Sequence, residues 1–256
     1  MKLAKTFKNC CYYKRRGLHM SNTNDVIAVP SKAFFIDMLV RDVALLDAVV
    51  DLVDNSVDAA NRSAAGGPLT SYWARITLGS DSFKIEDNCG GMTIKDARER
   101  AFRFGRSPIP ALDKQVSTVA SPSPSTALRE IGQFGVGMKR TIFKLGRMFH
   151  VTSRTSRSRF TIDQDVDKWI QSDGPEWHFS FSEVVDETDQ APPFGTTVIV
   201  NRLHHVVAEQ IKTENFAILL AGKIQSAHPV ALTRGLSISI NGIPVTMNVS
   251  GLLSSE

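Results

Sequence analysis

Apolar and polar positions alternate with a helical period between Leu45 and Ala60, in the sequence LLDAVVDLVDNSVDAA. At 3.6 residues per turn, the apolar face comprises Leu45, Leu46, Val49, Val53, Val57 and Ala60. The opposite face comprises Asp47, Asp51, Asp54, Asn55 and Asp58. Like charges one turn apart weaken a helix. Two interpretations follow: a solvated acidic stripe, or a polar face that holds a metal ion and activates water.

The remaining periodicity predicts an α+β domain. Helices are expected over residues 33–40, from Thr93 to Phe104, from the glycine-rich segment 131–139 to near Gly146, and from Glu209 to Ile224. Strands are expected over residues 72–78, 82–86, 148–152, 159–162, 178–182 and 196–201, with a final hairpin over 237–247 around Asn241-Gly242. Because no βαβ alternation occurs, we predict helices packed on one face of a mostly antiparallel sheet.

Charge separates the N-terminal end from the rest of the chain. The net charge is +4, but residues 1–19 contribute +6 and the remainder carries −2. The basic pI therefore does not indicate a nucleic-acid-binding face on the folded body. We expect residues 1–24 to be a disordered extension, with Met20 as a plausible alternative start, and residues 25–256 to form a single domain. A basic tail for an acidic partner is the other interpretation of the extension.

Cysteine content and hydropathy indicate a cytoplasmic protein. Cys10 and Cys11 lie in the basic extension, which leaves only Cys89 in the body. Three cysteines in 256 residues do not make a disulfide framework. The extension lacks the apolar core of a secretory signal, and no apolar run has the length of a membrane helix. We expect an intracellular setting and no membrane partner.

Two glycine-rich turns follow the acidic helix. The first is DNCGGM, residues 87–92, and the second is GQFGVG, residues 132–137. Between them, residues 105–130 are rich in serine and proline, which is typical of disorder or a functional lid. Each turn alone is more often a tight turn than a ligand site, and the second fails the P-loop pattern because Met138 stands where lysine is required. The three segments in this order are a more specific signal.

In this order, the segments resemble the GHKL superfamily of ATPases, which comprises gyrase, heat-shock-90 chaperones, histidine kinases, MutL and the related MORC proteins. Residues 51–59 are similar to the N box, residues 87–92 to the first glycine box, residues 132–139 to the second, and residues 195–197 to the final threonine motif. The second glycine box is most similar to the heat-shock-90-like and MORC-like branches. The resemblance implies a Bergerat fold that holds ATP between helices and an antiparallel sheet.

The resemblance assigns roles to individual residues. Asn55 would bind Mg²⁺, which usually takes one or two protein ligands beside phosphate and water. Asp51 would be the catalytic base, and Asp58 would anchor neighbouring structure. Asp87 would accept a hydrogen bond from the adenine amino group. The remaining cofactor-binding residues implied are Gly91 and Met92 at the adenine, Gly132, Gln133, Phe134, Gly135, Val136, Gly137 and Lys139 at the phosphates, and Thr196 beside Asp87.

Two positions depart from the superfamily pattern. Cys89 stands where the first glycine of the first glycine box is expected, which would cost energy if that position needs a positive φ. Asp51 replaces the glutamate of the hydrolytic members and is one methylene shorter. A displacement of about 1 Å at a catalytic group can cost about a hundredfold in rate. The main hypothesis is therefore a slow Mg²⁺-dependent ATPase, with an ATP sensor that does not hydrolyse as the alternative and a histidine-kinase-type phosphotransferase as a third, less favoured one.

The resemblance also implies partners. An ordered lid commonly forms a dimer surface in this superfamily, so we expect an ATP-dependent homodimer. Members of this superfamily often continue into a transducer domain, and we expect none after the final hairpin. We therefore expect either an output protein or a DNA-processing partner on another polypeptide, or a lone ATPase domain.

Overall fold

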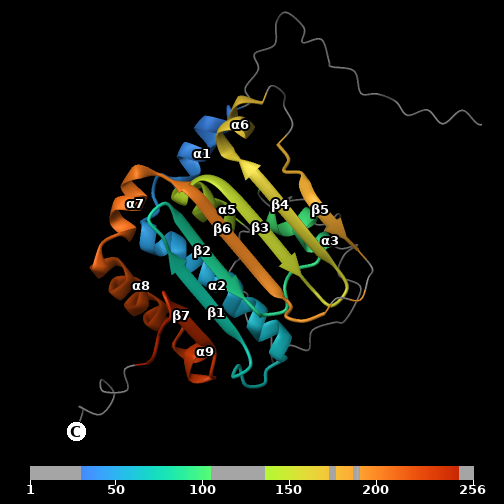
Figure 1. Ribbon diagram of the computed structural model, residues 1–256, viewed down its shortest axis with the longest axis vertical. Coiled ribbons are helices and arrows are strands. Elements are labelled where there is room, and N and C mark those ends of the chain that lie inside the picture. The colour runs from blue at the N-terminus through green and yellow to red at the C-terminus, as the bar shows by residue number, and fades with distance from the viewer. Residues whose placement is uncertain (1–29, 105–135, 173–176, 187–188, 190, 248–256) are drawn as a thin grey trace, which may run out of the picture.

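The computed structural model describes residues 30–104, 136–172, 177–186, 189 and 191–247. Within these ranges, eight strands form one sheet in the order β5-β4-β3-β6-β2-β1-β7-β8 (Figure 1). Their bounds are β1 Trp73–Leu78, β2 Ser82–Asp87, β3 Gly146–Arg154, β4 Arg159–Asp165, β5 Phe181–Val185, β6 Gly195–Leu203, β7 Ser237–Ile240 and β8 Ile243–Pro244. Every neighbouring pair is antiparallel except β1 and β7, which are parallel. The predicted α+β class with a mostly antiparallel sheet is confirmed.

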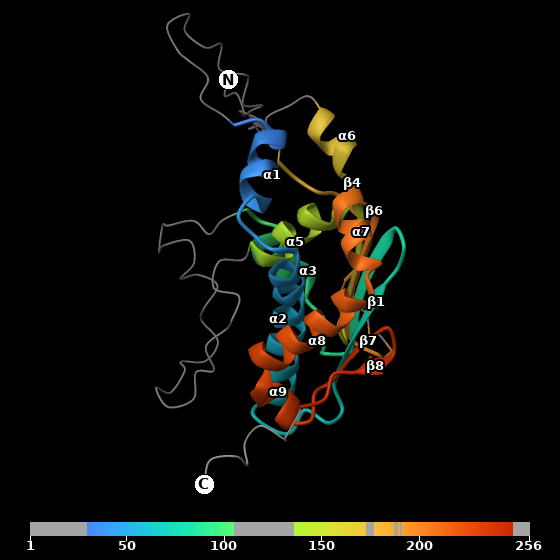
Figure 2. The ribbon, with the colours of Figure 1, turned by 90° about the vertical axis from the view of Figure 1, so that its left-hand side faces the viewer.

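The helices cover one face of this sheet, as the edge-on view in Figure 2 shows for α2, α5 and α8. Their bounds are α1 Lys32–Val40, α2 Leu45–Ala64, α3 Ile94–Asp96, the π-helical turn η1 Ala97–Ala101, α5 Gly137–Leu145, α6 Val166–Gln171, α7 His205–Ile211, α8 Glu214–Ala227 and α9 Pro229–Thr233. The apolar side of α2 and the inward-facing residues of the strands belong to one hydrophobic core. Burial of this side fixes which face of α2 stays polar and open.

The predicted amphipathic helix is confirmed and is one turn longer than expected. α2 continues through Ala64, and Ala65 ends it in the left-handed conformation with φ 46°. Val49, Val53 and Ala60 are fully buried, whereas Asn55 on the opposite face is exposed. The 3.6-residue period therefore assigned the faces correctly.

Three predicted elements were wrong in detail. The helix expected up to Phe104 is one short turn followed by η1, because the Phe102 N–H donates to Ala97 O five residues back. The single helix expected over residues 209–224 is α7 and α8, because the Thr213 hydroxyl donates to Gln210 O and interrupts the helical hydrogen bonds. The strand expected at residues 178–182 begins at Phe181, where its pairing with β4 is irregular.

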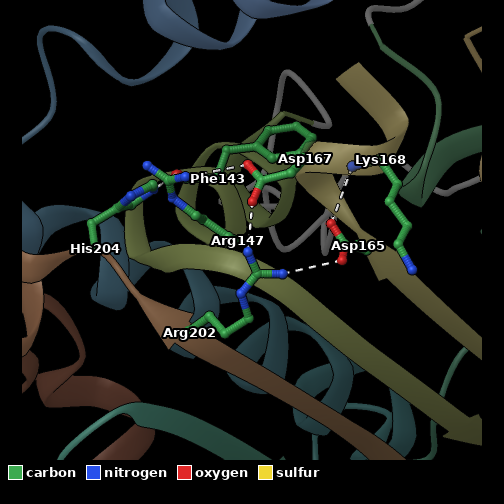
Figure 3. Close-up of polar contacts among 7 residues, drawn as sticks. All are labelled: Phe143, Arg147, Asp165, Asp167, Lys168, Arg202 and His204. Atoms are coloured by element: carbon green, nitrogen blue, oxygen red, sulfur yellow. Dashed lines mark hydrogen bonds and ion pairs between the residues drawn. The ribbon is translucent and has the colours of Figure 1, made fainter. Parts of the chain in front are cut away.

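An ion-pair network joins the start of α6 and the end of β4 to the start of β3 and the end of β6 (Figure 3). The Arg202 guanidinium donates to Asp165 Oδ2 at 3.1 Å and to Asp167 Oδ2 at 2.6 Å. Arg147 lies 3.5 Å from the second oxygen of Asp167. Next to this network, His204 precedes α7 and its Nε2 lies 3.1 Å from Phe143 O. The ring of His204 thus contacts a backbone carbonyl within the fold.

The last hairpin has the turn conformation that the Asn241-Gly242 sequence predicts. Asn241 and Gly242 have φ of 48° and 80°, the two positive values that a type I′ turn requires. A Cβ at Gly242 would meet nothing within 4 Å, so a substitution there is opposed only by the backbone conformation.

We expect Gly242→Ala to lower the free energy of unfolding by about 1–2 kcal/mol, because an L-residue is strained in this region. Gly222 in α8 also has open space around it but a helical backbone. The matched control Gly222→Ala should raise stability by up to about 1 kcal/mol. Urea unfolding midpoints measure both changes, and equal shifts in the same direction would contradict the turn assignment.

Candidate functional site

A cleft of about 600 Å³ lies between the helices and the sheet. Its walls are the polar face of α2, the end of β2 with the turn that follows, α3 and η1, the start of α5, and β6. These segments are far apart in the sequence and meet only in the fold. Nine predicted site residues line the cleft: Asp51, Asn55, Asp58, Asp87, Gly91, Met92, Val136, Gly137 and Thr196.

Asp87 is held in the cleft wall by donors from three elements. Its Oδ2 accepts a hydrogen bond of 2.9 Å from the Ser56 hydroxyl on α2. Its Oδ1 accepts from the N–H of Cys89 at 2.9 Å and from the N–H of Thr196 at 3.2 Å. Burial raises the pKa of the Asp87 carboxyl, and these hydrogen bonds oppose that shift. The carboxylate is therefore fixed in orientation and retains acceptor capacity toward the cleft, because a carboxylate offers about four acceptor sites.

The turn after Asp87 places its glycines where side chains have no room. Gly90 and Gly91 have φ of 101° and 71°, and a Cβ on Gly91 would lie 2.2 Å from Arg154 O. Cys89 has no positive φ, so the expected backbone cost at this cysteine does not arise. Its side chain is 1% exposed, and Sγ lies 3.7 Å from Trp73 O. The cysteine occupies an ordinary core position and the left-handed conformation falls on the next two residues.

A buried serine that the sequence did not indicate connects this turn to the sheet. The Ser153 hydroxyl on β3 accepts a hydrogen bond of 2.8 Å from the Met92 N–H. It also lies 2.9 Å from Thr196 Oγ1 and 3.3 Å from Gly195 O. The side chain of Ser153 is fully buried. It fixes the positions of Met92 and Thr196, both of which line the cleft.

The acidic residues of α2 have separate partners. Asp47 pairs with Lys223 of α8, and Asp54 Oδ1 lies 3.0 Å from Nε2 of the buried His228. Asp51 pairs with Arg140 of α5. Asp54 also lines the cleft, so it is more than an ordinary surface charge. The positive charges of Lys223 and Arg140, which come from α8 and α5, thus offset part of the repulsion that the sequence pattern implies.

Asn55 lines the cleft from the polar face of α2, between Asp51 and Ser56 in the sequence. Its Nδ2 donates to Asp51 O at 3.0 Å, which orients the side-chain amide along α2. No cluster of three or more histidine, cysteine or acidic residues suited to a metal ion occurs in the part of the chain that the structure describes. Mg²⁺ usually takes only one or two protein ligands beside phosphate and water, so the Asn55 oxygen is chemically suited to it without such a cluster.

The start of α5 meets Asp51 across the cleft. A Cβ on Gly137 would lie 3.4–3.5 Å from the Asp51 side chain. Arg140, three residues further on and so on the same helix face, reaches the Asp51 carboxylate and lines the cleft. Sequence analysis missed Arg140. Its spacing from Gly137 is the signal that could have indicated it.

Lys139 is not among the residues that line the cleft. Its side chain is buried, and Nζ donates a hydrogen bond of 2.6 Å to Ala101 O at the end of η1. Nζ also lies 5.6 Å from the centre of the Phe104 ring. Burial lowers the pKa of the Lys139 ammonium to about 8. The geometry thus gives Lys139 a contact with the end of η1, and the predicted contact with phosphate stays untested.

Part of the predicted site cannot be placed. Gly132, Gln133, Phe134 and Gly135 lie outside the described residues, as do the predicted extension over residues 1–24 and the lid over 105–130. The roles predicted for them stay predictions.

With this geometry in view, comparison with known families identifies the class of protein. The model of the Histidine kinase-, DNA gyrase B-, and HSP90-like ATPase family matches residues 43–189, more than half of the chain. The chain therefore belongs to this family of ATP-binding domains. The match begins just before α2 and ends before Thr196. It does not resolve a branch, so the heat-shock-90-like and MORC-like assignment stays a prediction.

No curated protein matches the chain significantly. Among the described residues, none of the helices has the length and apolar character required to cross a membrane.

The buried Lys139 predicts a specific pH dependence. Its pKa is lowered from 10.5 to about 8 by burial, so the folded protein releases this proton at lower pH than the unfolded chain does. The free energy of unfolding should therefore rise between about pH 8 and pH 10.5 by an amount that Lys139→Met lacks. At about 1.4 kcal/mol per pKa unit, the difference between the two proteins should change by up to about 3 kcal/mol. Urea denaturation of both proteins from pH 7 to 10 measures it, and parallel curves would contradict a buried ammonium.

Proposed function

We propose that the cleft binds ATP with its adenine at Asp87 and its phosphates toward Asn55, Asp51 and Gly137, together with Mg²⁺. The observation that supports this orientation most directly is the fixed Asp87 carboxylate, an acceptor that matches the amino group of adenine. Guanine presents a carbonyl oxygen at the corresponding position, which a carboxylate would repel. Met92 lines the same part of the wall and offers a polarisable side chain to the ring.

The phosphate end of the proposal follows from the course of α2. Ser56, which holds Asp87, and Asp51 are five residues apart, or about 7.5 Å along the helix axis. A nucleotide anchored at Asp87 and lying along the polar face of α2 would pass Asn55 before reaching Asp51. A Cβ on Gly137 would be in van der Waals contact with the Asp51 side chain, so the start of α5 and Asp51 lie side by side at this end of the cleft. This end of the cleft can therefore receive the phosphates at the N-terminus of α5.

We also propose slow hydrolysis with Asp51 as general base, in a module that acts as a nucleotide-driven conformational switch and forms an ATP-dependent homodimer. The output would pass to a protein or DNA-processing partner on another polypeptide. The family supports ATP binding, and the superfamily resemblance motivates these finer steps. The ATP sensor without hydrolysis is the second candidate, and it is favoured if the Asp51–Arg140 ion pair persists when ATP is bound, because the carboxylate is then engaged.

Asp87→Asn tests adenine recognition. The amide oxygen can still accept from Cys89 and Thr196, but the amide nitrogen would oppose the adenine amino group as a second donor. We expect ATP and ADP affinity to fall by about tenfold to a hundredfold, since an unpaired buried donor costs about 1–3 kcal/mol. Isothermal titration calorimetry with ATP, ADP and GTP, with and without Mg²⁺, measures this.

The control for that titration is Asp163→Asn on β4, which removes an exposed carboxylate that contacts Ser182 and His150 instead of the cleft. It should bind ATP like the wild type. Because an amide lacks the desolvation cost of Asp87, Asp87→Asn should unfold at no lower urea concentration than the wild type. Unchanged ATP affinity in a folded Asp87→Asn protein would remove the proposed adenine site.

Asp51→Asn separates the hydrolase from the sensor. If Asp51 is the base, steady-state ATP turnover should fall by about a hundredfold or more while ATP still binds. Equal turnover in the two proteins would exclude Asp51 as the base, and a wild type without turnover would favour the sensor. Asp51→Asn should keep its bound ATP, so it is also the protein in which to test the homodimer. Light scattering would compare its molar mass in ATP and in ADP.

A further inference from the structure

The Asp51–Arg140 ion pair joins α2 to α5 at the proposed phosphate end of the cleft. Arg140 comes from the first turn of α5 and Asp51 from the second turn of α2. Their side chains are 30% and 23% exposed, and both line the cleft. The pair therefore faces the space that a terminal phosphate would enter.

Packing alone does not account for this pair. α2 and α5 are already joined by the hydrogen bond from Thr141 Oγ1 to Ala48 O, and both residues are fully buried. A partly exposed ion pair adds little stability, typically less than about 1 kcal/mol. The Arg140 Nε is buried and has no hydrogen-bond partner among the described residues. The guanidinium is thus only partly satisfied by Asp51.

The charges at this end of the cleft also favour a transfer of Arg140 from Asp51 to a bound phosphate. Asp51 and a terminal phosphate are both anions, so they compete for the same cation and repel each other if both remain unpaired. A guanidinium binds phosphate through two parallel N–H donors. ADP, which is one phosphate shorter, would leave Arg140 with Asp51.

We propose that Arg140 is the ligand of the terminal phosphate and the residue that distinguishes ATP from ADP. This inference rests on the proposed ATP site. In the nucleotide-free protein Asp51 holds the guanidinium in the cleft. ATP then takes over the guanidinium and releases the Asp51 carboxylate. In hydrolysis the freed carboxylate would accept a proton from the attacking water as the new P–O bond forms, while the bond to the leaving ADP oxygen breaks.

A double-mutant cycle tests this exchange. The proteins are wild type, Arg140→Gln, Asp51→Asn and the double variant, each titrated with Mg²⁺ and either ADP or a non-hydrolysable ATP analogue with an imido bridge. We expect Arg140→Gln to lower affinity for the analogue by about tenfold or more, which corresponds to loss of one charge-assisted hydrogen-bonded contact. Affinity for ADP should change by less than about threefold.

Asp51→Asn should have the opposite effect. Release of Arg140 in the free protein should raise affinity for the analogue several-fold and leave ADP affinity unchanged. In the Arg140→Gln background the same substitution should have no further effect. A gain that persists in the double variant would show simple charge repulsion and overturn the exchange.

Arg100→Gln is the matched control, because Arg100 also lines the cleft but comes from η1 and pairs with Asp96 instead. It should not alter the ratio of analogue to ADP affinity. Equal effects of Arg100→Gln and Arg140→Gln, or equal loss of analogue and ADP in Arg140→Gln, would overturn the inference. Arg140→Lys keeps the charge but loses the paired donors, so its affinity for the analogue should lie between those of the wild type and Arg140→Gln. It replaces Arg140→Gln in the test if that variant does not fold. If the wild type binds neither ADP nor the analogue, the proposed ATP site itself is refuted.

Discussion

The partly buried carboxylate of Asp87 is the constraint on which the geometry of the cleft depends. A charged group taken out of water needs compensating donors, and here they come from a helix, a turn and a strand. Satisfying one side chain therefore sets the distance between α2, the glycine turn and β6. The strand is close enough that a Cβ at Gly195 would lie 1.8 Å from Asp87 O. The donors that hold the Asp87 carboxylate are therefore also the contacts that join the helix to the sheet.

The aspartates on the polar face of α2 repel one another in an isolated helix but have separate partners in the fold. In isolation its aspartates oppose helix formation. In the fold, Lys223, Arg140 and His228 each approach a different aspartate from a different part of the chain. Because packing of the apolar face stabilises the helix, the polar face can carry charges that an isolated helix would not tolerate. The result is three local environments along one helix instead of a uniform acidic surface.

The segments that precede residue 105 and follow residue 135 are both attached to the core. Phe104 stacks on Phe143 with ring centres 6.2 Å apart, and its ring also lies near Trp169 and Trp177. Lys139, just after the second glycine-rich segment, donates to Ala101 just before Phe104. A buried ammonium and an aromatic cluster thus hold η1 against α5. These contacts bring together two chain segments that both line the cleft.

The sequence by itself determined the elements whose signals are local. The 3.6-residue period located α2 and its faces, and Asn241-Gly242 located the last turn. The resemblance to the GHKL superfamily pointed to Asp87, Asn55 and Gly137, which the fold brings to one cleft. Only the tertiary structure decided which side chains meet. Ser56 and Ser153 have no local signal of their contacts, because a hydroxyl gains its role from a partner on another element. Arg140 has only its spacing from Gly137, which does not show that it meets Asp51. The π-turn at η1 and the break at Thr213 escaped prediction for a related reason: single hydrogen bonds decide them, and hydrophobic periodicity does not report single hydrogen bonds.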